Sequence, residues 1–281
     1  CADPRLGGVA ITGSTGTAQD INRQLAARGG PIVPLIAETG GLNAMIVDST
    51  ALPEQVVQDV ITSAFDSAGQ RCSSLRMLCL QEDIADKVLA MLRDAMTELR
   101  IGDPGRLDTD IGPVIDEASR ANLERHIEAM RVRGRRIFQL PLPEAHARGT
   151  YFSPTVVEIG APSELTDEVF GPVLHVWRFG RGELPQLLAA INGAGYGLTM
   201  GVQSRIDETV DYVIANAHVG NIYVNRNMVG AVVGVQPFGG EGRSGTGPKA
   251  GGPLYLERLQ QFAGVQFRPP GQIREDPRAT G

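Results

Sequence analysis

The 281-residue chain is 42% hydrophobic and 21% charged, which is typical of a globular protein with one large domain or two smaller ones. Its net charge of −6 provides no basic field for a nucleic-acid backbone or an anionic membrane surface, so we expect neither partner. The longest apolar runs fall far below the roughly 18 residues of a membrane-spanning helix, and we expect no secretory leader, because no charged segment followed by an apolar one is found at residue 1 onward.

The cysteines also limit the possibilities. There are three, Cys1, Cys72 and Cys79, and four histidines are scattered along the chain. The odd number and unpaired spacing indicate neither a disulfide framework nor a zinc site, so we expect no metal. We expect a reducing, cytoplasmic compartment, where a single well-placed cysteine is more often reactive than structural.

Short apolar runs alternate with amphipathic stretches along most of the chain. The predicted elements are strand 9–12, helix 18–27, strand 44–47, helix 53–65, strand 77–80, helix 84–99, helix 118–130, strand 137–140, strand 174–179, helix 184–191, strand 200–203, helix 208–216 and strand 222–225. This rhythm predicts an α/β protein with a largely parallel sheet.

Two glycine-rich segments interrupt the rhythm. Residues 230–252 are too specific in pattern for a disordered loop and indicate a functional one, whereas the polar tail from Arg268 is expected to be mobile. A formal GxGxxG match at residues 240–245 has no strand leading into it and no amphipathic helix after it, so we interpret it as loop.

The first candidate site is residues 12–17, Thr-Gly-Ser-Thr-Gly-Thr, between a predicted strand and a predicted helix. Hydroxyls and glycines at a helix N-terminus form an anion site, because free N–H groups and the helix dipole point at it. An ordinary N-cap is the alternative, since Ser and Thr are favoured there without any phosphate.

The second candidate is Glu38, which follows the apolar run 32–37 and precedes Thr39, Gly40 and Gly41. A carboxylate at a strand end lies where α/β sheets place their sites, and the glycines let another backbone or a cofactor approach closely. Taken alone, an exposed carboxylate before a turn is the more common case.

The third candidate is Cys72, which follows a predicted helix ending at residues 67–69 and has Arg71, Ser73 and Arg76 nearby. A guanidinium or backbone N–H groups beside the thiol would lower its pKa and favour the reactive thiolate. Space filling is the alternative, since cysteine is among the most buried residue types.

Five motifs then occur in the order found in one enzyme family. They are the turn Thr12-Gly13-Ser14, Glu38-Thr39-Gly40-Gly41-Leu42-Asn43, Gly69-Gln70-Arg71-Cys72, Glu168-Val169-Phe170-Gly171-Pro172 and Pro237-Phe238-Gly239-Gly240. Together they resemble the aldehyde dehydrogenase superfamily over nearly the whole chain. The amino-acid sequence at 72–74, 230–240 and 244–253 is most similar to the L-glutamate γ-semialdehyde (1-pyrroline-5-carboxylate) dehydrogenases, as in the C-terminal part of bacterial proline utilisation A proteins.

The resemblance implies an α/β, aldehyde dehydrogenase-like fold, with a catalytic domain built on a largely parallel sheet and a partial Rossmann-type NAD domain. It places the C-terminal half of the NAD domain at 1–66 and the catalytic domain at 67–241. Residues 242–281 would form a C-terminal loop, a return to the NAD domain or oligomerisation region, and a mobile tail. A complete member also has an upstream region that supplies the first half of the NAD fold and an oxyanion-hole asparagine. We therefore expect a C-terminal fragment with little or no activity alone.

The implied reaction is the NAD-dependent oxidation of L-glutamate γ-semialdehyde to L-glutamate, a step of proline catabolism. Cys72 would attack the aldehyde and, after hydride transfer, hold a thioester that water activated by Glu38 hydrolyses. The implied cofactor-binding residues are Gly13, Ser14, Thr15, Glu168 and Phe170.

For the substrate, the resemblance implies that the N–H groups of Gly230 and Ala231 hold a carboxylate, that Ser73 adds a hydroxyl and that Phe238 walls the aliphatic chain. A loop rich in glycine only for tight turning is the alternative.

Three other functions stay open: an aldehyde dehydrogenase for another semialdehyde, a non-catalytic oligomerisation module, and a thiol hydrolase without cofactor. The expected partners are a small aldehyde, further copies in a homo-oligomer and a covalently linked proline dehydrogenase domain. The preference between NAD and NADP stays open, because its usual determinants lie upstream.

Overall fold

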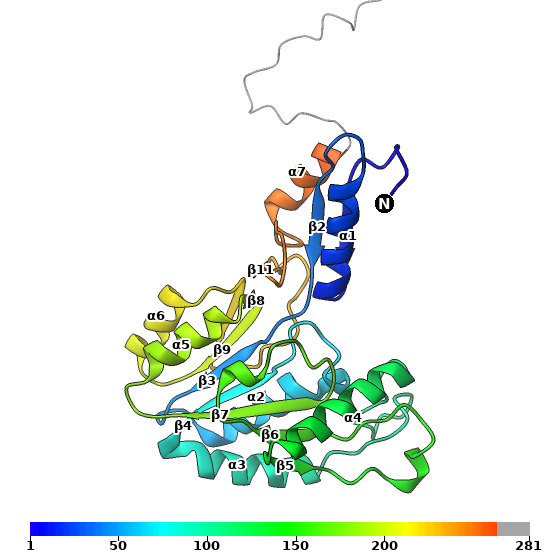
Figure 1. Cartoon of the computed structure of the whole chain (residues 1–281). Helices are drawn as coiled ribbons and strands as arrows, with labels where there is room; N and C mark the ends of the chain where they lie inside the picture. Colours follow the sequence, from blue (N-terminus) through cyan, green and yellow to red (C-terminus); the bar gives the residue numbers. More distant parts are fainter. Residues whose placement is uncertain (263–281) are drawn as a thin grey trace, which may run out of the picture.

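The structure is a computed structural model, and it describes residues 1–262. A seven-stranded sheet with its helices forms most of the protein, and a smaller unit of β1, β2, α1 and α7 lies beside it (Figure 1). The tail expected to be mobile, from Arg268, lies outside the described residues.

The strands are β1 Val9–Thr12, β2 Leu35–Glu38, β3 Ala44–Val47, β4 Met77–Gln81, β5 Arg136–Gln139, β6 Thr155–Glu158, β7 Val173–Phe179, β8 Tyr196–Gly197, β9 Thr199–Gln203, β10 Asn221–Val224 and β11 Glu241–Gly242. The helices are α1 Thr15–Ala27, α2 Pro53–Phe65, α3 Glu82–Thr97, α4 Glu117–Val132, α5 Leu184–Gly193, α6 Asp207–Asn216 and α7 Pro253–Phe262. Every strand and helix predicted from the sequence is confirmed to within a few residues. The strands β6, β8 and β11 and the helix α7 are additional to that prediction.

The seven-stranded sheet has the order β10-β9-β3-β4-β7-β6-β5. Its neighbouring strands are parallel except for β5, which runs antiparallel to β6 on the edge. This confirms the largely parallel α/β sheet. The central strands β3, β4 and β9 are buried along their whole length, as expected for a parallel sheet with helices on both faces.

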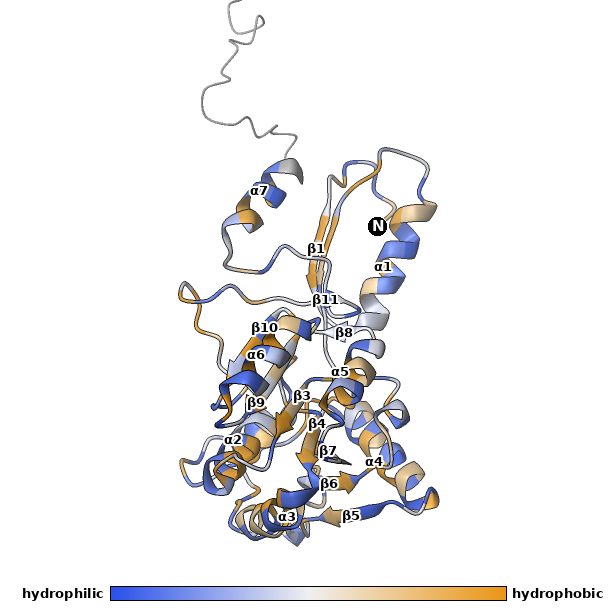
Figure 2. Ribbon diagram, turned by 90° about the vertical axis from the view of Figure 1, so that its left-hand side faces the viewer, coloured by the Kyte–Doolittle hydropathy of each residue, from blue (hydrophilic) through white to orange (hydrophobic). Residues whose placement is uncertain are grey.

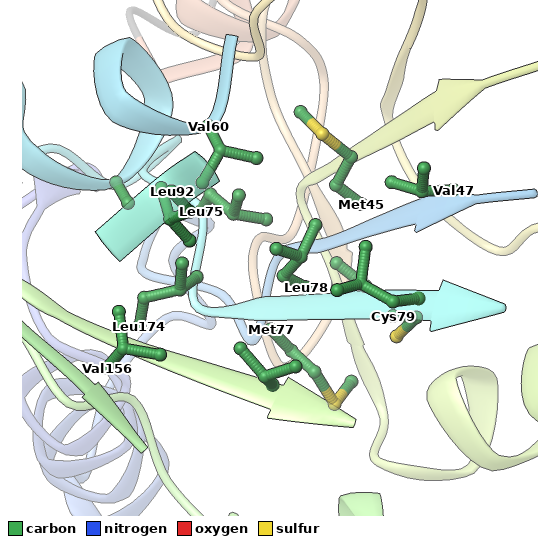
Figure 3. Close-up of a cluster of buried hydrophobic side chains, with 14 of the residues drawn as sticks. Met45, Val47, Val60, Leu75, Met77, Leu78, Cys79, Leu92, Val156 and Leu174 are labelled. Carbon is green, nitrogen blue, oxygen red and sulfur yellow. The ribbon is translucent and has the colours of Figure 1, made fainter. Parts of the chain in front are cut away.

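The hydrophobic core lies between this sheet and the helices α2 and α3, which pack against each other and against β7. Figure 3 shows Val60 of α2 and Leu92 of α3 beside Leu174 of β7, and all three are fully buried. The next residue of β7, His175, points to the opposite face and meets His126 of α4. Apolar residues accordingly line the central strands, as the hydropathy colouring in Figure 2 shows.

Two short sheets complete the fold. The strands β1 and β2 pair in parallel within the smaller unit, and β8 pairs antiparallel with β11 from the glycine-rich segment. The segment interpreted as loop at 240–245 is therefore a turn with a two-residue strand, and no helix follows it directly.

The expected domain boundaries at 66 and 241 stay predictions. Because β3 pairs with β4 and β9 of the large sheet, we propose that the N-terminal part of the smaller unit ends before Ala44.

Candidate active site

A cavity of about 870 Å³ lies between the two parts of the fold. It is bounded by the segments after the carboxyl ends of β1 and β2 and by those before the amino ends of β4 and β7. The lining residues are Thr12, Gly13, Ser14, Thr15, Gly16, Thr39, Gly40, Gln70, Arg71, Cys72, Ser73, Asp167, Glu168, Phe170, Tyr196, Gly230, Ala231 and Phe238. Every site residue expected from the sequence, except Glu38, lines this one cavity.

The segment that leads to Cys72 is a short turn with left-handed backbone rather than the end of an α-helix. The helix α2 ends at Phe65, and residues 66–69 form a 3₁₀ turn in which Ser67 and Ala68 have φ of 56° and 52°. Gly69, with φ of 64°, packs so closely that a methyl group there would lie 2.2 Å from the carbonyl oxygen of Gly171. The expectation of a helix reaching residue 69 was wrong, because left-handed backbone cannot continue an α-helix.

Asn43 fixes this turn to the sheet. Its Nδ2 donates to the carbonyl oxygens of Cys72 at 2.6 Å and Ser74 at 2.8 Å, and its Oδ1 accepts from the N–H of Thr199 at 3.2 Å. Asn43 is the last residue of the carboxylate motif at 38–43. This motif is therefore joined by direct hydrogen bonds to the segment that carries Cys72.

A buried ion pair links the same turn to Glu168. Arg76 is 1% exposed, and its Nη2 lies 2.9 Å from Oε1 of Glu168. Its Nη1 donates to the carbonyl oxygens of Gly69 at 2.8 Å and Gly171 at 3.1 Å, and the guanidinium lies 5.2 Å from the ring centre of Phe170. Arg76 therefore connects the segment that carries the thiol to the segment that carries Glu168 and Phe170.

Glu168 also lies against the glycines of the carboxylate motif. A methyl group at Gly40 would lie 1.5 Å from Oε2 of Glu168, so only glycine leaves room for this carboxylate. Burial raises the pKa of Glu168, and the charge and hydrogen bond of Arg76 act in the opposite direction.

The thiol of Cys72 differs from expectation. Burial raises its pKa, and the negative charge of Glu168 raises it further. Hydrogen bonds from the backbone N–H groups of Ser73 and Cys72, and the charge of Arg76, oppose these effects without overcoming them. The expected lowering of the pKa was wrong, because burial has the largest effect on the thiol and the nearby guanidinium is already paired with a carboxylate.

Glu38 lies at the end of β2, half-buried, and its carboxylate faces the glycine-rich segment rather than the cavity. Its Oε2 accepts from the N–H of Gly240 at 3.0 Å, and a methyl group at Gly239 would lie 2.9 Å from its Oε1. That Oε1 is buried and has no hydrogen-bond partner in the structure. Burial raises the pKa of Glu38, with the N–H of Gly240 and the charge of Lys249 opposing the shift.

At the α1 side of the cavity, Ser14 is the N-cap of the helix, with its Oγ accepting from the N–H of Thr17 at 3.0 Å. The N-cap interpretation is confirmed, and Gly13, Ser14 and Thr15 also line the cavity. On the opposite side, Gly230 has φ of 82°, a conformation that favours glycine.

The profile of the aldehyde dehydrogenase family matches residues 1–265. The chain belongs to this family. It is 64% identical over 266 residues to the bifunctional protein PutA of Escherichia coli K12, covering 92% of this chain and 20% of that protein.

Solved structures of related aldehyde dehydrogenases agree with this assignment. A crystal structure of a bifunctional proline utilization A protein matches with a TM-score of 0.88 and 57% identity, covering 92% of this chain and 26% of that one. A 1-pyrroline-5-carboxylate dehydrogenase from Thermus with bound NAD matches with a TM-score of 0.81 and 31% identity, covering 92% of this chain and 50% of that one. The chain thus spans between a fifth and a half of these relatives.

Two residues of this aldehyde dehydrogenase site were missed from the sequence. Arg76 was noted only as a charge near Cys72, because nothing in the neighbouring sequence showed that its side chain would be buried against Glu168. Tyr196 lines the cavity, and its only sequence signal was an aromatic residue between Gly195 and Gly197.

Two further observations concern residues 1–262. In this range no helix is long and apolar enough to cross a membrane. Within the same range, no group of three or more His, Cys, Asp or Glu side chains is arranged to hold a metal ion.

Proposed function

We propose that this chain provides the thiol site and part of the cofactor site of an NAD-dependent L-glutamate γ-semialdehyde dehydrogenase. The observation that carries the proposal is the single cavity that brings Cys72 together with Ser14, Glu168, Gly230 and Phe238. The names of the relatives, PutA and 1-pyrroline-5-carboxylate dehydrogenase, support the choice of substrate.

The cofactor side of the cavity suits a dinucleotide. The N-terminus of α1 offers free N–H groups and the positive end of the helix dipole to a pyrophosphate. The Glu168 carboxylate, which fits only because Gly40 has no side chain, is placed to accept hydrogen bonds from ribose hydroxyls. When bound, NAD accepts the hydride of the substrate.

The chemistry then belongs to two side chains. The thiolate of Cys72 adds to the aldehyde carbon, and loss of hydride leaves a thioester on the sulfur. Glu38 takes a proton from water, the resulting hydroxide attacks the thioester, and the C–S bond breaks to release the carboxylate product and the thiolate. Because Glu38 faces Gly240 in the structure, its carboxylate must rotate about its side-chain bonds to reach the cavity.

On the substrate side, we propose that the backbone N–H groups of Gly230 and Ala231 bind the substrate carboxylate, with the hydroxyl of Ser73 beside it and Phe238 against the aliphatic chain. This arrangement would favour a semialdehyde that carries an anionic group over a neutral aldehyde of the same length.

The relatives also support proposals about the whole protein. We propose that the chain is part of a longer, bifunctional polypeptide with a proline dehydrogenase domain, that it works as a homo-oligomer in the cytoplasm, and that activity needs residues outside this chain. The three unpaired cysteines fit a reducing compartment.

The test uses the 281-residue chain with Cys1→Ser, which removes the exposed thiol and leaves the buried Cys79 as an internal reference. We expect iodoacetamide to label Cys72 and not Cys79, at a rate that NAD changes. NADH formation with L-glutamate γ-semialdehyde is then compared with that for a neutral aldehyde of equal length, in this chain and in a longer polypeptide that contains it. A labelling rate that ignores NAD, together with no NADH from either polypeptide, would overturn the proposal.

A further inference from the structure

The glycine-rich segment at 239–246 contacts both sides of the cavity. The N–H of Thr39 donates to the carbonyl oxygen of Ser244 at 2.9 Å, and its Oγ1 donates to that of Arg243 at 2.6 Å. On the other side, the N–H of Arg243 donates to the carbonyl oxygen of Gly195 at 2.8 Å, beside the β8–β11 pairing. The backbone around Arg243 is therefore fixed between the carboxylate motif and β8.

The side chain of Arg243 extends from this fixed point to the segment that carries Glu168. Its Nη2 donates to Oδ1 of Asp167 at 2.8 Å, and its Nη1 donates to the carbonyl oxygen of Thr166 at 3.1 Å. The same guanidinium stacks on Tyr196, 4.2 Å from the ring centre. Two of its three contacts, Asp167 and Tyr196, are with residues that line the cavity.

Thr15 continues the connection to α1. Its Oγ1 donates to the carbonyl oxygen of Arg243 at 3.3 Å. Thr15, Tyr196 and Asp167 all line the cavity. One continuous set of contacts therefore runs from the N-terminus of α1, through Arg243, to the residue preceding Glu168.

We propose that Arg243 is a positioning residue for the dinucleotide, because it sets the separation between the N-terminus of α1 and the Glu168 carboxylate. The ligand in this statement rests on the proposed function, in which these two groups hold the pyrophosphate and the ribose. A fixed separation lets both groups bind one ligand without first being ordered, which lowers the entropic cost of binding.

Arginine suits this role better than lysine. Its planar guanidinium donates to two acceptors at fixed angles and stacks on an aromatic ring, whereas an ammonium group offers one point charge. Arg243 is 38% exposed and Asp167 is 73% exposed, so their ion pair contributes little to folding stability. Removing the side chain should therefore alter the ligand site while the fold remains.

The test compares Arg243→Met and Arg243→Lys with a matched control, Arg178→Met, all in the Cys1→Ser chain. Arg178 is 33% exposed and lies 2.7 Å from Asp86, and it is absent from the cavity lining. The first readout is the NAD concentration that gives half of the change in Cys72 labelling. The second is hydrogen exchange of the amides at 165–170, measured without NAD.

We expect Arg243→Met to raise the half-effect NAD concentration about tenfold, as for the loss of one charge-assisted hydrogen bond and one stacked contact. The labelling rate without NAD should stay unchanged, exchange at 165–170 should rise, and Arg243→Lys should fall between Met and wild type. The control should match wild type in both readouts.

The two proposals fail in different ways. If NAD has no effect on labelling of the wild-type chain and no NADH forms from the longer polypeptide, the proposed NAD use is wrong, and exchange at 165–170 still decides whether Arg243 holds that segment. If wild type responds to NAD and Arg243→Met responds at the same concentration, the positioning role is overturned. Unchanged exchange in the variant overturns it as well.

Discussion

Replacing Glu168 with glutamine isolates the electrostatic control of the thiol. The substitution removes the carboxylate charge that raises the pKa of Cys72 and leaves Arg76, which lowers it, without its ionic partner. Removal of one nearby charge lowers a pKa by about one unit, so the thiolate fraction at pH 8 rises about tenfold. A less basic thiolate attacks disulfides more slowly, by about threefold per unit. We therefore expect Cys72 of Glu168→Gln to react with a disulfide reagent about threefold faster than wild type at pH 8.

The assay follows the reaction of the Cys1→Ser chain with an aromatic disulfide reagent from pH 7 to pH 10 without NAD. The matched control is Glu158→Gln, because Glu158 is equally exposed, at 15%, and also lies 2.9 Å from an arginine. Its charge is not among those that act on Cys72. A pH midpoint that stays in place or moves upward in Glu168→Gln, with the fold intact, would refute the assignment of this charge.

Three other changes test the packing. Burial lowers the pKa of His175 to about 3, so below pH 6.5 the unfolded chain binds a proton that the folded chain does not bind. The contribution of this group to the free energy of unfolding is complete above pH 6.5 and falls by about 2 kcal/mol by pH 5. Urea unfolding should show this slope in wild type and a shallower one in His175→Gln, where only His126, whose pKa burial also lowers, still contributes. Gly40→Ala should cost about 1–3 kcal/mol, since its methyl group would displace the Glu168 carboxylate, whereas Gly193→Ala meets open space and should be neutral or stabilising in the same measurement. Leu78→Ala, at a fully buried position of the central sheet, should cost about 2–5 kcal/mol, and a loss under 1 kcal/mol in denaturant titration would contradict the packing.

The regular part of the fold could be predicted because its pattern is local. The range 53–65 predicted for helix α2 was correct, since Pro53 marks its start and an apolar stripe runs through it; only its expected extension to residue 69 was wrong. The helix α7 was missed because it follows directly on a glycine-rich segment interpreted as a functional loop, although Pro253 at its first position is a signal of a helix start. The turn at 66–69 was missed because its left-handed residues include Ser67 and Ala68, which carry no sequence sign of that conformation.

The sequence predicted which residues form the site, but not the direction in which the pKa of the thiol is shifted. Ordered motifs selected Cys72, Glu168 and Phe238, and the structure brings them into one cavity. The direction of the thiol's pKa could not be inferred, because it depends on burial and on which carboxylate Arg76 pairs with, both long-range properties. The same holds for Glu38, whose carboxylate orientation is set by an N–H group about two hundred residues away along the chain.

These opposing charges also bear on when the thiol becomes reactive. At rest, burial and the Glu168 carboxylate keep Cys72 protonated, while Arg76 supplies a compensating positive charge. In the proposed function, Glu168 accepts hydrogen bonds from ribose hydroxyls, and such bonds disperse its negative charge. NAD should therefore move the pH midpoint of Cys72 labelling downward in wild type. The Glu168→Gln chain has no such charge to disperse, so NAD should leave its midpoint in place even where the ligand still binds. A thiol that ionises only beside bound cofactor would be spared reaction with electrophiles in the empty site, which gives a physical reason for placing a carboxylate next to a nucleophile.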